Sequence, residues 1–424
     1  MRDGAILKKR MLSVVGLLFS GEMFLCLFLY AGYFKAYFTF PVDLTLLFMI
    51  LSFVVVVKRN IKNKEITKAV FLAIALYTSI FMLILISLFY TESVIYAYDK
   101  AIRFSIITGW AFVGALLLIK DMKSLKIFLF NILIISVAMS ISSFNLINSN
   151  GSLASGYLMN YASVGRASGV GLLILCCLVF FRNTSFKMKL FATTVFALIL
   201  FSVLISGARM PLIATLTLLV YLYFKSVRIE NRILYVNKGF KWLTSLFLLS
   251  ILSFFTIADS ALFSRVMYRL GLLKNIEVGS DPTGRLDRYE RAMSMWRDSP
   301  LFGEGIGSFG LSFTGVDSTN YPHNIFLEIL AELGLFGLLL FLTTLILSFF
   351  FMIRAYKNDY TDKAVILAVI LGFLYFLFSA SVAGDINDNK ILITFIALGF
   401  SLSRFTHRKS SCSKVDSNCV TVNQ

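Results

Sequence analysis

The stretch YPHNIFLEILAELGLFGLLLFL, residues 321–342, places a histidine directly before a long apolar run. The run continues for about the 20 residues that a helix needs to cross a bilayer, so it predicts a membrane-spanning helix with His323 at its mouth. Glu328 and Glu332 lie four residues apart and share one face of that helix. Carboxylates inside a membrane span are rare without a role. Gly334 and Gly337 are expected to allow close helix packing.

The composition extends this interpretation to the whole chain. Of the 424 residues, 58% are hydrophobic and 15% are charged, and the mean hydropathy is +0.82. A soluble chain of this length could not bury so much apolar surface. The sequence therefore predicts an all-α polytopic membrane protein.

Apolar runs bounded by charged residues predict twelve spans. They cover about residues 11–34, 39–57, 68–90, 101–119, 126–145, 168–182, 187–207, 210–224, 241–258, 324–353, 363–382 and 390–404. An even count puts both termini on one side, and seven basic clusters fall on that side. The positive-inside rule makes it the cytoplasm. This placement accounts for the net charge of +17 without nucleic acid as a partner.

Four segments follow from this topology: spans one to nine (1–258), a long outer loop (259–322), spans ten to twelve (323–404) and a cytoplasmic tail (405–424). The outer loop, of about 64 residues, is far longer than the others and is expected to be functional. The five cysteines form no even framework, so no disulfide is implied. His407, Cys412 and Cys419 in the tail match no zinc spacing, and no metal site is predicted.

Within the outer loop, Asp281 is a plausible N-cap and Pro282 a plausible first helical residue. A helix of about 16 residues should follow and end before Pro300. Its expected apolar stripe consists of Leu286, Tyr289, Met293 and Trp296, and this face should lie against the membrane or the protein. After the helix, GEGIGSFG (303–310) matches no nucleotide-binding pattern and predicts a tight turn.

Several arginines are candidate anion-binding residues, because a guanidinium can grip phosphate oxygens with its planar fork. Arg285 should lie at the edge of the loop helix's stripe, and Arg288 and Arg291 should rotate away from it. Arg209 ends the seventh span on the outer face, and Arg166 lies in a shorter outer loop, 146–167. The alternatives are contact with lipid headgroups for the loop helix and snorkelling to the interface for Arg209.

His323 is the candidate base. A neutral imidazole with a pKa near 6.5 can take a proton from a hydroxyl nucleophile at neutral pH, although a structural histidine is the ordinary alternative. Glu328 and Glu332 could bind sugar hydroxyls, orient the histidine or pair with an arginine, and the sequence does not choose among these roles.

Together these residues resemble the O-antigen polymerase and ligase superfamily of bacterial membrane glycosyltransferases. The ligase signature is His, then Asn, Ser or Gln, then nine residues and G-x-x-G. It is matched by His323, Asn324, nine residues, Gly334 and Gly337. The similarity covers about residues 146–382 and includes SGAR (206–209) and TGRLDRYERAMSMWRDSPLFGEGIGSFG (283–310).

The resemblance implies a metal-independent enzyme of the C-type membrane glycosyltransferase kind, with no cofactor. Its donor would be a glycan on undecaprenyl pyrophosphate, taken from the bilayer on the periplasmic face of the bacterial inner membrane. His323 would be the general base, and Arg209 and Arg285 would bind the leaving pyrophosphate. Arg288, Arg166, Glu328 and Glu332 are further substrate-binding candidates. A chain-length regulator and a flippase would be partners in polysaccharide export.

Two reactions share these residues in that superfamily. A polymerase joins lipid-linked repeats, and a ligase moves the finished chain to lipid A–core. The segments 283–310 and 322–337 look more like the polymerase branch. A flippase for the same lipid-linked sugar would also have twelve spans and cationic cavity residues, but the sequence shows no repeats that mark the inverted halves of a transporter. A structural membrane scaffold is the remaining alternative.

Overall fold

The computed structural model describes residues 16, 19–34, 41–60, 67–148, 161–180, 184–206, 208–230, 233–236, 242, 244–245, 284–358 and 361–405. Its elements are α2 (Gly21–Phe34), α3 (Leu44–Asn60), α4 (Lys68–Ser87), α5 (Ile95–Arg103), η1 (Phe104–Thr108), α6 (Gly109–Leu118), α7 (Met122–Asn148), α8 (Tyr161–Leu175), η2 (Cys176–Phe180), α9 (Phe186–Ser206), α10 (Arg209–Lys225), β1 (Val227–Glu230), β2 (Ile233–Val236), α13 (Arg285–Asp298), α14 (Ser308–Thr314), α15 (Ile325–Lys357), α16 (Lys363–Ala380) and α17 (Lys390–Ser401).

The described part of the chain is a helical bundle, as the apolar runs predict. Seven of its helical segments are long and apolar enough to cross a membrane. Four more apolar helices, α2, α3, α10 and α17, have 17 residues or fewer. The predicted ninth span, 241–258, lies almost wholly outside the described residues. The expected count of twelve spans is therefore not reached in the described residues, because an apolar run need not form a helix of full length.

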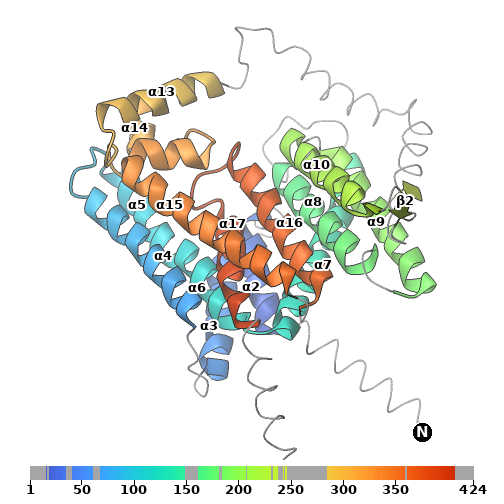
Figure 1. Ribbon diagram of the computed structural model, residues 1–424. Coiled ribbons are helices and arrows are strands. Elements are labelled where there is room, and N and C mark those ends of the chain that lie inside the picture. Colours follow the sequence, from blue (N-terminus) through green and yellow to red (C-terminus); the bar gives the residue numbers. More distant parts are fainter. Residues whose placement is uncertain are drawn as a thin grey trace, which may run out of the picture.

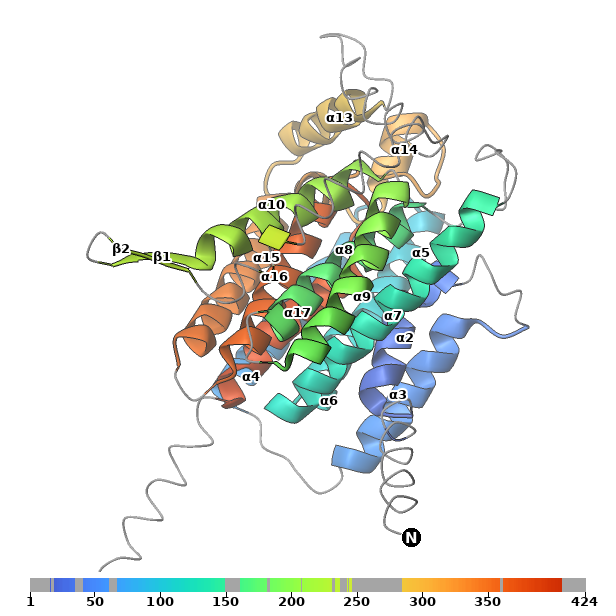
Figure 2. The same cartoon turned by 90° about the vertical axis from the view of Figure 1, so that its right-hand side faces the viewer.

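One element departs from the all-α expectation. Strands β1 and β2 pair antiparallel, with Val227 opposite Val236, in a segment that the predicted topology places in a cytoplasmic loop. The hairpin follows α10 directly and projects from the side of the bundle (Figure 2). Its strands have only four residues each, so the fold class remains helical.

The core lies where α16 packs against α8 and α17, which in turn pack against α7 and α6, respectively. Eleven of the twelve residues of α17 are buried, and its Phe395 packs against Phe376 of α16 and Phe128 of α7. By contrast, α3, α4, α9 and α10 leave large apolar side chains exposed, including Phe53, Phe71, Phe191 and Phe224. In a bilayer such surfaces face lipid, so these four helices form the bundle's periphery.

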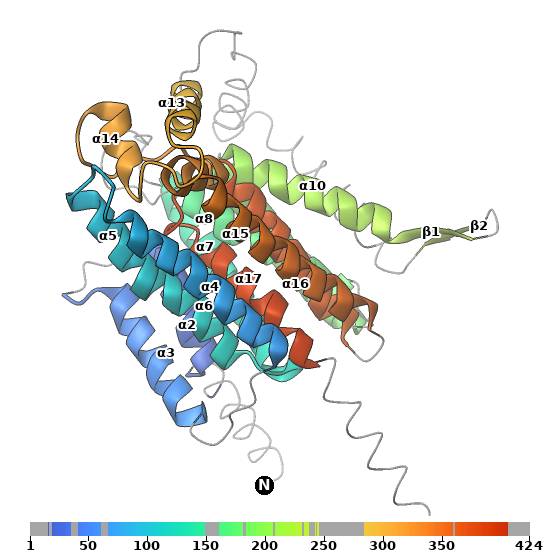
Figure 3. The ribbon, with the colours of Figure 1, turned by 60° about the vertical axis from the view of Figure 1, so that its left-hand side comes forward.

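The two ends of the bundle differ in character. Helices α13 and α14 and the start of α15 lie together at one end (Figure 1), and α10 begins at that same end (Figure 3). At the other end Lys126 Nζ lies 2.9 Å from Asp362 Oδ2, and Lys225 Nζ lies 4.2 Å from the centre of the Tyr356 ring. Basic residues thus gather opposite the long loop. Which end faces the cytoplasm stays a prediction.

The fourth span begins six residues earlier than expected. Helix α5 starts at Ile95 and continues through a π-helical turn, Phe104–Thr108, into α6. Tyr77 of α4 donates a hydrogen bond of 2.8 Å to the carbonyl oxygen of Phe104. The predicted outer segment 91–100 is therefore largely helical, and Lys100 lies inside the span. A hydropathy boundary stops at a charged residue even when that residue is paired within the protein.

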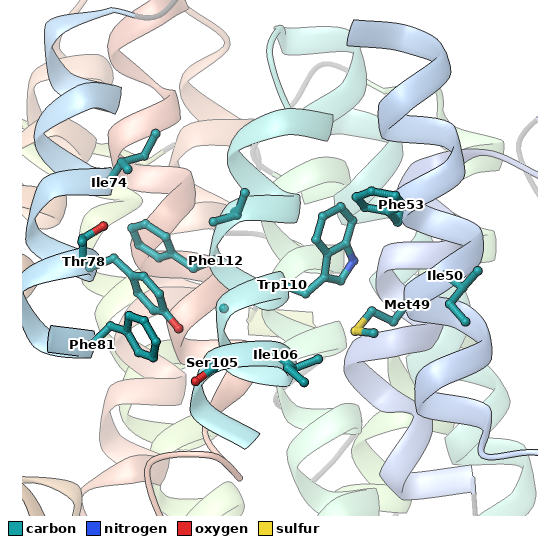
Figure 4. Close-up of a pocket in the computed structure, with 13 residues that line it drawn as sticks. Met49, Ile50, Phe53, Ile74, Thr78, Phe81, Ser105, Ile106, Trp110 and Phe112 are labelled. Carbon is teal, nitrogen blue, oxygen red and sulfur yellow. The ribbon is translucent and has the colours of Figure 1, made fainter. Parts of the chain in front are cut away.

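An apolar groove of about 550 Å³ lies between α3, α4 and the η1–α6 segment (Figure 4). Figure 4 shows Trp110 and Phe53 on one side of it and Phe112 and Phe81 on the other. No charged side chain lines it, and Phe53 and Ile50 are exposed at its edge. The groove therefore offers apolar packing without a charged group, and the Tyr77 hydroxyl in its lining already donates to the carbonyl oxygen of Phe104.

Candidate functional site

Helix α15 is interrupted one third of the way along. Gly334 has φ 64° and ψ −163°, which breaks the helical hydrogen bonds around it. A segment of the outer loop fills the break: the carbonyl oxygen of Pro300 accepts from Leu335, and the amide of Glu304 donates to Ala331. Further bonds join Phe336 to Leu301 and Gly305 to Glu332. The expectation that Gly334 serves close helix packing is wrong, because its role is to turn the backbone.

The glycine-rich stretch after α13 forms the tight turn that the sequence predicts. Gly303, Gly305 and Gly307 all have positive φ values, between 69° and 93°. A Cβ on Gly303 would lie 2.5 Å from the carbonyl carbon of Glu332, so the turn presses directly on the backbone of α15. Only glycine permits both the left-handed conformation and this approach.

Helix α13 starts later than expected, and its buried face is a narrow one. Gly284 is its N-cap, in the left-handed conformation at φ 60°, and the helix has 14 residues. Asp281 and Pro282 lie outside the described residues. The buried side chains are Ala292 and Met295, whereas Leu286 is 56% exposed. The face that packs against α15 is therefore the one that carries Arg288 and Arg291, and whether the predicted stripe faces the membrane stays a prediction.

The two arginines on that face are held by the loop that they cover. Arg288 donates to Asn320 Oδ1 (3.2 Å) and to the carbonyl oxygen of Tyr321 (3.0 Å). Its guanidinium also lies 4.9 Å from the centre of the Phe313 ring. Arg291 donates to Ser312 Oγ at 2.8 Å. Arg288 therefore holds the backbone just before His323 in place.

His323 lies at the mouth of α15, where the sequence predicts it. It is the one non-glycine residue with positive φ (61°) in the described residues, a conformation that strains a histidine backbone. Asn324 follows as the N-cap and accepts from the amides of Phe326 and Leu327 at 3.0 and 3.2 Å. The Tyr321 ring meets the imidazole edge-on at 4.6 Å. The Asn324 cap and the positive φ of His323 together fix the orientation of the His323 backbone at the start of α15.

The electrostatic surroundings keep His323 neutral. Partial burial lowers the pKa of the imidazole below its ordinary value, and the positive charges of Arg288 and Arg285 lower it further. At neutral pH the side chain is then an unprotonated imidazole, which can accept a proton. The structure thus brings His323, Arg285 and Arg288 together, as the candidate site requires.

Arg166 lies inside α8 and not in the outer loop expected for it. Its guanidinium lies 5.7 Å from the centre of the Tyr33 ring. Its charge also acts on Tyr321 and on Asp388, so it belongs to the surroundings of the His323 loop. Burial and the negative charges of Asp388 and Asp385 raise the pKa of Tyr321 to about 12.

Arg209 is the first residue of α10 and is partly buried. Within the residues that the structure describes, it makes no hydrogen bond and no ion pair. Its helix begins at the same end of the bundle as α13 (Figure 3). Arg209 is therefore a cation near membrane depth whose charge is not matched by a carboxylate in the described part of the chain.

Sequence reasoning missed an acidic loop, residues 381–389, which joins α16 to α17. Asp385 accepts from the Tyr96 hydroxyl at 3.2 Å and from the backbone amide of Asp388 at 2.7 Å. Burial and the neighbouring Asp385 raise the pKa of Asp388. The signal was present as GDINDN (384–389), two aspartates in a short outer segment.

Glu328 and Glu332 both contact Lys100, a residue that was not among the predicted site residues. Lys100 Nζ lies 2.5 Å from Glu328 Oε1 and 2.6 Å from Glu332 Oε2. All three side chains are at most 1% exposed. Neither carboxylate pairs with an arginine in the described residues, and neither is accessible from the surface of the protein.

The arrangement combines a neutral imidazole, several guanidinium groups and a carboxylate loop at one end of the bundle. Such a set can remove a proton from a hydroxyl and stabilise negative charge that develops on a phosphate. Among the described residues, no group of three or more His, Cys, Asp or Glu side chains could hold a metal ion.

Comparison with known proteins supports this interpretation. Residues 194–342, about a third of the chain, match the family model described as O-Antigen ligase. The matched range includes Arg209, α13, the glycine-rich turn and the His323 segment. The resemblance to the O-antigen polymerase and ligase superfamily is thereby confirmed. No curated protein matches the chain.

Proposed function

Because residues 194–342 match the family model described as O-Antigen ligase, we propose that the protein is a polysaccharide polymerase of the O-antigen polymerase and ligase superfamily. It joins oligosaccharide repeats carried on undecaprenyl pyrophosphate at the periplasmic face of the bacterial inner membrane. Both termini lie in the cytoplasm, the twelve spans are divided by the outer loop 259–322, and residues 405–424 form a cytoplasmic tail.

The observation that carries the proposal is the neutral His323 held beside Arg285 and Arg288 at the mouth of α15. In the proposed reaction, an acceptor sugar hydroxyl gives its proton to His323 as its oxygen attacks the anomeric carbon of the donor. The bond from that carbon to the pyrophosphate oxygen breaks, and undecaprenyl pyrophosphate leaves. Glycosyl transfer then needs no nucleotide.

The leaving pyrophosphate gains negative charge, so cations positioned where the charge develops lower the barrier. Arg209 suits this role because it has no carboxylate partner in the described residues. Arg285 suits it because its charge already acts on His323. Arg288 and Arg166 would position the loop and the acceptor. With these cations on the leaving group, we expect activity to survive chelation by EDTA.

Ligation of the finished polymer to lipid A–core is the second candidate, and the description of the matched family favours it. A ligase would use the same base and the same arginines with a different acceptor. The lipid-linked glycan and the bilayer are partners in either reaction. A chain-length regulator and a flippase would be further partners.

The test is a gel ladder of surface polysaccharide from cells that lack the gene and carry wild type or His323→Ala. Core bearing one repeat in the deleted cells supports polymerisation. Bare core, with polymer left on its lipid carrier, supports ligation instead. A normal ladder with His323→Ala would overturn the general-base assignment in both reactions.

Arginine variants sharpen the test. Arg285→Lys and Arg209→Lys should lose most activity, because lysine is a point charge that cannot reproduce the planar fork. Arg297→Ala is the matched control, since this exposed residue lies on the same helix as Arg285 and donates only to its own helix at Met293. A flippase would instead leave lipid-linked repeats on the cytoplasmic face. A scaffold would tolerate alanine at His323, Arg209 and Arg285 together.

A further inference from the structure

The buried cluster of Lys100, Glu328 and Glu332 has an unbalanced set of charges. One ammonium group contacts both carboxyl groups, at 2.5 and 2.6 Å. The lysine side chain is 0% exposed and each glutamate 1%, so water does not screen the three groups. If both carboxyl groups were ionised, the cluster would hold a net charge of −1 within the membrane span. Burying such a charge is costly.

The surroundings make the imbalance larger. The Tyr96 ring lies 5.7 Å from Lys100 Nζ, and the Tyr96 hydroxyl donates to Asp385, which is also buried. Asp385 adds a second negative charge beside the glutamates. In the described part of the chain, no cation other than Lys100 contacts either glutamate. The titratable groups that face the cluster from α5, α15 and the 381–389 loop therefore add no compensating positive charge.

Each glutamate also has one carboxylate oxygen without a hydrogen-bond donor. Glu328 Oε2 and Glu332 Oε1 are buried and have no hydrogen-bond partner. A carboxylate oxygen that has lost water without gaining a donor is unfavourable, whereas two neighbouring carboxyl groups that share one proton remove both the excess charge and one empty acceptor. The proton then belongs to the pair and not to either residue.

The cluster also connects the parts of the candidate site. The amide of Glu328 donates to the carbonyl oxygen of Asn324, the residue after His323, at 2.9 Å. Glu328 Oε1 accepts from the amide of Ile386 at 3.3 Å, and Asn387 donates to the carbonyl oxygen of Lys100 at 3.1 Å. One buried group thus contacts α5, the first turns of α15 and the acidic loop.

We propose that Glu328 and Glu332 together bind one proton at neutral pH, and that this neutral cluster with Lys100 positions the His323 segment against the 381–389 loop. Lys100, Glu328 and Glu332 are then positioning residues and do not touch the substrate. The bound proton is the ligand of this site. Proton binding by the two glutamates does not depend on the proposed function. Only the activity measurement described below rests on the proposed function.

Proton binding is tested by the pH dependence of unfolding in mixed SDS and detergent micelles. An unfolded glutamate is ionised above its ordinary pKa of about 4.3, so a cluster that keeps one proton takes it up on folding. Stability is then lost as pH rises, and the unfolding equilibrium constant should rise about tenfold per pH unit for this one proton. Glu332→Gln or Glu328→Gln removes the need for the proton, so the difference in slope between wild type and either variant should be close to that value.

Infrared difference spectra between wild type and Glu332→Gln give an independent readout. We expect the carbonyl band of a protonated carboxylic acid at pH 7, shifted in heavy water and absent from the variant. Carboxylate bands alone, with equal pH slopes for wild type and both glutamine variants, would overturn proton binding. The control is Asp99→Asn, which alters an exposed residue on the same helix as Lys100.

The positioning role is tested by the double variant Glu328→Gln/Glu332→Gln, which leaves Lys100 buried without a counter-ion. Its unfolding equilibrium constant should rise by about two orders of magnitude, whereas each single variant keeps a one-to-one pair and stays near wild type. Below its unfolding midpoint, the double variant should lose kcat with little change in KM. A single variant as unstable as the double would show that both glutamates are needed in ionised form and would overturn the proposal. If only the expected loss of kcat is not observed, that result would count against the proposed reaction and not against proton binding, because the infrared spectra and the pH slopes do not depend on the reaction.

Discussion

The amide nitrogen of Leu335 donates a hydrogen bond of 3.0 Å to the carbonyl oxygen of Pro300, which lies in the outer loop. This bond continues the backbone hydrogen bonding of α15 past its break at Gly334. In a bilayer an open amide would cost several kcal/mol, so loop and helix are stable only together. The loop segment 300–305, which leads into the glycine-rich turn, thus supplies backbone hydrogen bonds that helix α15 lacks at its break.

Gly334→Ala should therefore destabilise the protein strongly. The new Cβ would lie 2.4 Å from the carbonyl carbon and oxygen of Leu301, at φ 64°. Gly315→Ala is the control, because Gly315 also has positive φ (72°) but has nothing within 4 Å of an added Cβ. We expect about 1 kcal/mol for the control and about 2 kcal/mol more for Gly334→Ala, measured by unfolding in mixed micelles. Equal losses would show that backbone strain alone acts at Gly334.

Asp317 caps a helix from a distant loop. Its carboxylate accepts from Ser93 Oγ at 2.7 Å and from the amides of Val94, Ile95 and Tyr96, the start of α5. Burial opposes ionisation, but these hydrogen bonds outweigh it and leave the pKa of Asp317 below its ordinary value. Asp317→Ala should cost about 1 kcal/mol of unfolding free energy, as for the loss of an N-cap.

The comparison for Asp317→Ala is Asp99→Ala, which removes only an exposed i,i+4 pair with Arg103 and should cost less than about 0.5 kcal/mol. Because the folded pKa of Asp317 is lowered, its contribution is present above the unfolded pKa and is lost as pH falls through the folded pKa. The two variants should therefore converge with wild type in strong acid. If the Asp317→Ala variant remained less stable than wild type in strong acid, the role of the Asp317 carboxylate as a helix cap would be contradicted.

The activity of the wild-type protein should fall only in acid below pH 6.5. Burial, then Arg288 and Arg285, lower the pKa of His323, so the base stays neutral to a lower pH than a free imidazole. Arg288→Gln should move the acid limb of kcat/KM toward higher pH, and Arg288→Lys should leave it in place. Identical limbs for the glutamine and lysine variants would exclude Arg288 as a source of the shift.

The same lowered pKa affects stability. A histidine that is neutral in the folded state contributes stability above its unfolded pKa of about 6.5, and this is lost as pH falls through the folded pKa. Between those two values the unfolded chain binds the extra proton. His323→Ala should remove this part of the pH dependence of unfolding.

His323→Gly should separate strain from function. Glycine adopts φ 61° without steric cost, so the variant should be as stable as wild type or more stable by up to about 1 kcal/mol. It should nevertheless give no polysaccharide ladder, because the proposed base is gone. A clear loss of stability would mean that the contact with Tyr321 outweighs the strain.

Much of the fold could be predicted from the sequence. Apolar runs placed most helices to within a few residues, and α15 starts next to His323 and Asn324 as expected. The tight turn at 303–310 followed from glycine alone. These features depend on neighbouring residues and on the length that a bilayer requires, which a sequence displays directly.

The candidate site could be predicted only in part. The resemblance gave Arg285 and Arg288 as substrate-binding candidates, but only the structure shows that their charges act on His323. The buried face of α13 could not be predicted, because it depends on which parts of the chain cover the helix. The hydropathy boundaries predict Lys100 to be a loop residue, because they cannot anticipate a partner 232 positions away. The aspartate that caps α5 is similarly distant, 222 residues from Ile95.

Hydropathy and local motifs were enough to predict a helical membrane protein with a basic end, a long loop and a histidine at the mouth of a span. Those properties follow from hydrophobic transfer and local backbone geometry, which act over one or two turns. The contact of Lys100 with Glu328 and Glu332, and the hydrogen bond from Leu335 to Pro300, become visible only in the folded chain. Charge pairing and backbone hydrogen bonding inside a bilayer are satisfied by whichever groups the fold brings into contact, and chain order does not reveal them.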